Sequence, residues 1–63
     1  MRLTLRVLKS AMVATDYGLD EIAGKLRGTQ YAEAIAEVRK LHKATLRRVG
    51  ELLDIMIDQN YGD

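Results

Sequence analysis

Mostly apolar residues between positions 29 and 56 recur at the spacing of one helical face. Their intervals alternate between four residues and three without a break, as along a helix stripe that faces its neighbours. The stripe consists of Tyr31, Ile35, Val38, His42, Thr45, Val49, Leu52 and Met56. The flanking residues Leu41, Leu46, Leu53 and Ile55 widen it. A face this wide is typical of a helix in a bundle, which contacts more than one neighbour.

The first half of the chain has a matching stripe. It consists of Met1, Leu5, Leu8, Met12, Thr15, Leu19, Ile22 and Leu26. Between the two stripes, Gly28 is a natural helix stop and Thr29 is a plausible N-cap for a second helix. A link this short makes the two helices antiparallel neighbours. We therefore predict an all-α antiparallel helical hairpin, two long helices joined by a short loop near residues 27–30.

Folding the chain at this loop aligns the two stripes layer by layer. Leu26 then meets Tyr31 beside the loop, and Leu5 meets Leu52 at the open end. Charge agrees with this topology, because residues 1–10 carry three basic side chains and no acid, while residues 51–63 carry four acids and no base. Each exposed ion pair contributes little, but the pattern favours laying these two ends side by side.

The first helix carries a second apolar row, which predicts a further neighbour. The row is made of Leu3, Val7, Ala14 and Tyr17, with Ser10 among them. A helix that is apolar on two faces is usually covered on two sides, and large apolar patches are uncommon on monomers. Single exposed apolar residues are ordinary, so exposure of the row is the alternative. We expect the row to meet a protein partner or a second copy, giving a four-helix bundle by dimerisation or a higher oligomer.

Two glycines leave the continuity of the first helix open. Gly18 and Gly24 each cost about 1 kcal/mol relative to alanine in a helix interior. Thr15 or Asp16 could cap a new helix where Gly18 ends the old one, which would give three helices. The stripe keeps its phase across this stretch, and this favours one continuous helix.

The size and composition of the chain agree with a helical protein that needs a partner. Residues 1–63 form a single helical-hairpin domain at most, and a domain this short has a marginal core. There is no cysteine, so no disulfide can reinforce it, and one histidine is too few for a zinc site within one chain. No apolar run reaches the roughly 20 residues of a membrane span. We expect a cytoplasmic protein that does not enter the membrane.

A polar layer lies where the two predicted stripes meet, and it is formed by Thr15, His42 and Thr45. One such hydrogen-bonded layer commonly fixes the register and orientation of helices in bundles. The alternative is a layer that responds to pH or binds a metal, doubled across a dimer axis. The acidic residues form no catalytic constellation, and no phosphate-binding loop or nucleophile–base pair is visible. The sequence therefore predicts neither an enzyme nor a cofactor.

A basic belt lies on the second helix. It consists of Arg39, Lys40, Lys43, Arg47 and Arg48, with no acid between Val38 and Gly50. Such a belt is able to bind the phosphates of a nucleic acid or an acidic protein surface. It is equally typical of a solvated face, or of a row paired with glutamate and aspartate residues of a neighbouring chain. The net charge of only +1 and the lack of interleaved aromatic residues do not favour base recognition.

Two short segments resemble DNA-binding plans. Residues 2–7 alternate polar and apolar side chains as a strand does, which resembles the ribbon-helix-helix plan, with Arg2, Thr4 and Arg6 as readers. Residues 19–29 resemble the first helix and turn of a helix-turn-helix. In both cases the predicted second helix is longer than the plan allows. The leading prediction is a small non-enzymatic interaction protein, a regulator, adaptor or assembly subunit. The alternative is a nucleic-acid-binding regulator that uses the basic belt or an N-terminal basic ribbon.

Overall fold

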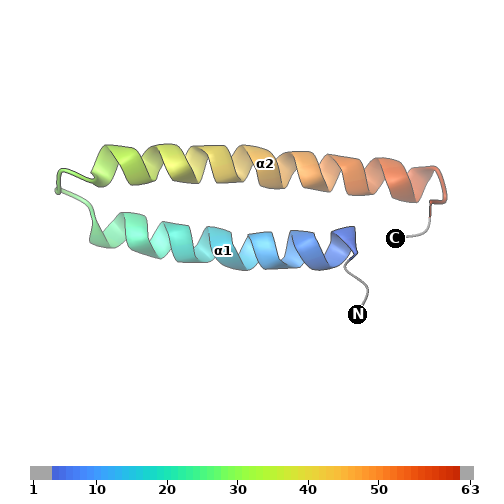
Figure 1. The fold of residues 1–63 in the computed structure, drawn as a ribbon, viewed down its shortest axis with the longest axis horizontal. Coiled ribbons are helices and arrows are strands. Elements are labelled where there is room, and N and C mark those ends of the chain that lie inside the picture. The colour runs from blue at the N-terminus through green and yellow to red at the C-terminus, as the bar shows by residue number, and fades with distance from the viewer. Residues whose placement is uncertain (1–3, 62–63) are drawn as a thin grey trace.

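The computed structural model describes residues 4–61, which form two helices, α1 (Leu5–Lys25) and α2 (Ala32–Asp58). The helices lie side by side and antiparallel, joined at one end by residues 26–31 (Figure 1). The prediction of an all-α hairpin is confirmed. The Cα extents are 47 × 22 × 12 Å, so the molecule is a single layer about one helix thick.

The start of α1 is fixed by its N-cap. The Thr4 hydroxyl oxygen accepts a hydrogen bond from the Val7 backbone N–H at 3.2 Å, which satisfies one of the donors left free at a helix start. Residues 5–7 are therefore helical and not part of a strand, and the polar–apolar alternation there follows the first turn of α1. Arg2 and Leu3, which belong to the predicted ribbon and apolar row, lie outside the described residues.

The turn is built around Gly28, whose φ of +81° lies in the left-handed region that favours glycine. Beside it, the Thr29 hydroxyl donates to the Leu26 carbonyl at 2.6 Å and accepts from the Tyr31 N–H at 3.2 Å. Thr29 was predicted to be the N-cap of α2, but it stabilises the turn instead. The helix α2 begins at Ala32, and Tyr31 is in its N-cap position. α1 runs through Gly18 without a break, so the three-helix alternative is wrong.

The contact between the helices differs from the predicted contact, in which the two apolar stripes face each other. Leu5, Met12 and Leu19 of α1 are partly buried as expected, but Leu8, Thr15 and Ile22 are exposed. Among residues 4–61 only Leu53 is buried, with 7% of its surface exposed. The helix faces in contact are rotated by about 45° from the centre of the apolar stripe, taking 3.6 residues per turn. A lone hairpin gives each helix one neighbour, whereas the stripe is wide enough for two.

Candidate self-association surface

One broad side of the hairpin is held by ion pairs between the helices, and we call it the polar face. The Asp20 carboxylate lies 2.7 Å from an Arg39 guanidinium nitrogen, and the Asp16 carboxylate lies 2.9 Å from the Lys43 ammonium. The Lys43 ammonium also lies 3.7 Å from Asp20. These four residues come from facing turns of α1 and α2, so the pairs fix both the register and the side on which the polar flanks meet.

The spacing of charged residues in the sequence contains a signal for this cluster. Asp16 and Asp20 are four residues apart on one helix, and Arg39 and Lys43 are four apart on the other. In an antiparallel hairpin such sets fall opposite each other, because residues four apart share a helix face. The sequence analysis predicted external anions or acids of a neighbouring chain as partners of the belt, whereas two of its partners are acids of the same chain.

The electrostatics of the polar face centre on Lys43 and Asp16. The hydrogen bond from the ammonium to Asp16 is the main cause that raises the pKa of Lys43 above its ordinary value of 10.5. The Asp16 carboxylate accepts this bond through Oδ2, while its Oδ1 is buried without a hydrogen-bond partner among the described residues. Only one of the two Asp16 carboxylate oxygens therefore accepts a hydrogen bond from the described residues.

The opposite broad side, which we call the apolar face, consists of the predicted stripe residues that the hairpin leaves uncovered. On each helix these residues lie on the flank away from Asp16, Asp20, Arg39 and Lys43, as their helical spacing requires. They are Leu8, Thr15 and Ile22 from α1, and Tyr31, Val38, Thr45 and Leu52 from α2. None of them is charged, and five are large hydrophobic residues between 40% and 57% exposed.

His42 lies half-buried at the centre of the helix contact, next to this apolar face. Its Nε2 is 2.8 Å from the Met12 backbone carbonyl oxygen. Since a carbonyl oxygen only accepts, Nε2 must carry the hydrogen in this arrangement. Thr15 and Thr45 are exposed, and their hydroxyls donate to the carbonyls of Ala11 and Leu41 one turn back, each at 3.0 Å. The predicted polar layer is thus two backbone-bonded threonines beside one histidine that bonds across to α1.

The second apolar row predicted on α1 lies away from α2. Val7 is 54% exposed, Tyr17 is 72% exposed and Ala14 is also exposed, while Leu3 lies outside the described residues. Helical spacing places the row on the outer edge of α1. These residues are accessible to a neighbour, and whether one binds there stays a prediction.

Members of the basic belt point in several directions. Arg39 and Lys43 are engaged by Asp20 and Asp16 within the chain, as described above. Arg47 and Arg48 both contact Glu51, at 3.5 Å and 3.4 Å. Lys40 lies on the outer side of α2 with no ion pair among the described residues. Nucleic-acid binding by this belt stays a prediction, and two of its five charges are already paired across the hairpin.

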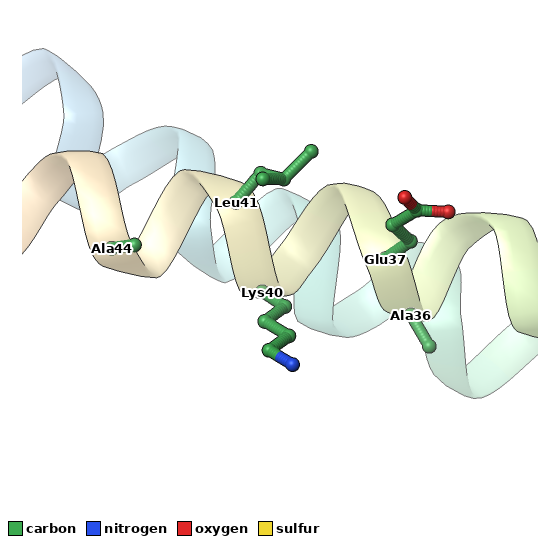
Figure 2. Close-up of a pocket in the computed structure, with 5 residues that line it drawn as sticks. All are labelled: Ala36, Glu37, Lys40, Leu41 and Ala44. Atoms are coloured by element: carbon green, nitrogen blue, oxygen red, sulfur yellow. The ribbon is translucent and has the colours of Figure 1, made fainter.

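A shallow hollow lies on the outer side of α2, next to the apolar face. It is lined by Ala36, Glu37, Lys40, Leu41 and Ala44 (Figure 2). Figure 2 shows Glu37 and Leu41 pointing to one side of the helix and Lys40 to the other. The Leu41 side chain is 62% exposed. The hollow is open to solvent and is formed by residues of α2 alone.

Within residues 4–61, no group of three or more potential metal-ligating side chains comes together. Neither of the two described helices combines the length and apolarity needed to cross a membrane. Comparison of the chain with protein-family models, with curated proteins and with solved structures gave no significant match.

Proposed function

We propose that this chain is a small non-enzymatic interaction protein whose apolar face packs against a second copy of itself, forming a four-helix bundle. In this role it serves as a regulator, adaptor or assembly subunit. The observation that carries the proposal is the uncharged apolar face, which exposes five large hydrophobic side chains on a hairpin in which Leu53 is the one buried residue among positions 4–61. Contiguous apolar patches of this kind mark interaction sites on soluble proteins.

The dimensions of the hairpin support a second copy as the occupant. Stable domains have at least two packed layers, and this hairpin is a single layer. Its broad side measures 47 × 22 Å between Cα atoms, a projected area of about 1,000 Å². A standard protein interface buries about 800 Å² on each partner, so one apolar face is large enough for a specific dimer.

The rotation of the apolar stripe also supports a bundle. In a four-helix bundle each helix has two neighbours at about right angles to each other, and its apolar stripe points between them. The stripe centre on α1 and on α2 is turned by about 45° from the hairpin contact toward the apolar face. A second hairpin under that face completes this geometry for all four helices.

The first test is the mass of the protein in solution. Size-exclusion chromatography with light scattering should give twice the chain mass of 7.1 kDa or a higher multiple. Helical circular dichroism should fall on dilution, because folding is then coupled to association. A folded monomer at micromolar concentration, with thermal unfolding that is independent of concentration, would overturn the proposal.

A pair of aspartate substitutions separates the apolar face from the rest of α2. Val38→Asp places a charge within the apolar face, whereas Ile57→Asp places one on the side of the polar face of the same helix, at a residue that is equally exposed in the hairpin. Val38→Asp should remove the dimer and most of the helical signal, because a buried unpaired charge is strongly destabilising. Ile57→Asp should leave both nearly unchanged. Equal behaviour of the two variants would contradict burial of the apolar face.

A further inference from the structure

We propose that the second copy lies with its loop at the opposite end of the bundle, so that α2 of one copy packs antiparallel against α2 of the other. This inference rests on the self-association proposed above and adds the orientation and the contact surface. The surface is the strip of α2 that joins the hollow to the apolar face, formed by Glu37, Leu41, Ala44 and Arg48.

The hollow has the form that receives a side chain from a neighbouring helix. Glu37, Lys40, Leu41 and Ala44 stand at positions i, i+3, i+4 and i+7, the four corners of a hole in knobs-into-holes packing. The side chains of Glu37 and Leu41 point to the same side of α2, away from Lys40 (Figure 2). By helical spacing this is the side of the exposed stripe residues Val38 and Thr45, so a helix under the apolar face runs along the strip.

Charge and size along the strip select the antiparallel register. The strip residues follow one another at intervals of four, three and four. When two copies of α2 are aligned antiparallel about the point between residues 42 and 43, Glu37 faces Arg48 of the second copy. In the same register Leu41 faces Ala44. Symmetry repeats both pairs, giving two opposite-charge pairs and two large-to-small pairs on one helix face.

The arrangement with both loops at the same end lacks this complementarity. It places α2 beside α1 of the second copy, in the same register as within the hairpin. Glu37 then lies level with Glu21 on the outer side of the bundle, so like charges approach there. Arg48 gains no acid, because the residue level with it, Lys9, lies in the hairpin contact beside Gly50. Like charges that face each other across an interface disfavour that pairing. The distribution of charge on α2 therefore favours opposite ends.

The orientation is measurable with one spin label per chain, because the sequence contains no cysteine. Gln30→Cys places the label in the exposed turn. With loops at opposite ends, the two labels of a dimer should lie roughly 35–40 Å apart, the rise of about 25 residues of helix. Loops at the same end would bring them within about 20 Å. In a mixture of Gln30→Cys and Gln59→Cys chains, the label on residue 30 of one copy should lie close to the label on residue 59 of the other copy.

The outcomes of this measurement are distinct. A long Gln30 distance together with a short mixed distance supports the proposal. A short Gln30 distance in a protein of dimer mass overturns the orientation and leaves self-association intact. A monomer mass with no coupling between labels overturns both.

Charge reversal tests the strip itself. Glu37→Arg should weaken dimerisation by about tenfold, since two attractive exposed pairs become repulsive. Adding Arg48→Glu to the same chain should restore most of the affinity, because the pairs are then re-formed with reversed signs. Failure of the double variant to recover affinity, measured by sedimentation at several concentrations, would contradict the proposed register.

Discussion

The two broad faces of this hairpin are built from the same two helices but are completed in different ways. On the polar face, Asp16 and Asp20 find their partners Lys43 and Arg39 within the chain. On the apolar face, leucine, isoleucine, valine and tyrosine side chains face solvent. The difference shows a division of roles. The charges of the polar face favour one register between α1 and α2 of the same chain. The apolar face would contribute hydrophobic stabilisation only if another surface covered it.

Two adjacent leucines give the largest test of this difference. Leu53 is 7% exposed in the hairpin contact, and Leu52 is 47% exposed on the apolar face. Leu53→Ala should cost about 2–4 kcal/mol of unfolding free energy. Leu52→Ala should cost about 1 kcal/mol or less if the apolar face is open, and about 2–3 kcal/mol if a second copy covers it. Urea unfolding of both variants at one protein concentration decides between these values, and a small cost at Leu52 would count against the dimer.

Two glycines in α1 provide a comparison of intermediate size. An added Cβ would meet no atom within 4 Å at Gly18 or at Gly24 in the hairpin. Helical spacing places Gly24 on the side of the polar face and Gly18 on the side of the apolar face. Gly24→Ala should therefore stabilise the protein by about 1 kcal/mol through helix propensity. Gly18→Ala should stabilise it less if the proposed second copy covers the apolar face, because its helix would leave less room there. Equal gains in melting experiments would indicate that α1 has no neighbour on that side.

The smallest expected effect is the pH dependence of the polar face. Asp16 raises the pKa of Lys43 in the folded state, so this pair stabilises the fold below pH 10.5 and loses its contribution as the pH rises through the folded-state pKa. Melting temperatures should therefore fall more steeply above pH 10.5 in the natural sequence than in Lys43→Met. The same slope in both proteins would show that Lys43 does not contribute to the pH dependence of the melting temperature. The dimer mass should not change in Lys43→Met at neutral pH.

Sequence patterning was sufficient for the elements and their topology. The unbroken spacing through Gly18 and the stop at Gly28 predicted two helices and an antiparallel hairpin, and the structure has both. Patterning did not predict which half of the stripe the hairpin covers. The apolar stripe of a helix includes the residues that face all of its neighbours. The stripe on α1 therefore does not distinguish the contact with α2 from a contact with another chain.

The candidate site was predictable to a smaller extent. The width of the stripe indicated more than one neighbour, but the second surface was expected at the row formed by Leu3, Val7, Ala14 and Tyr17. The structure adds the exposed half of the stripe itself as a larger apolar surface. The ion pairs of the polar face were not predicted, because the basic belt was interpreted only as a solvated face or as a site for partners outside the chain. Thr29 was assigned to the wrong element, since hydroxyl bonds in a turn and at a helix cap use the same residue types.

The turn at Gly28 also determines how quickly the chain reaches this structure. All contacts between α1 and α2 grow outward from a connection of only six residues, so the first of them join positions close in sequence. Loops of about ten residues close in 10–100 ns, and helical proteins dominated by such local contacts fold in microseconds to milliseconds. A single chain should therefore form and lose the hairpin many times before two copies meet at micromolar concentration. If the proposed dimer forms, the rate of refolding to it should increase in proportion to protein concentration.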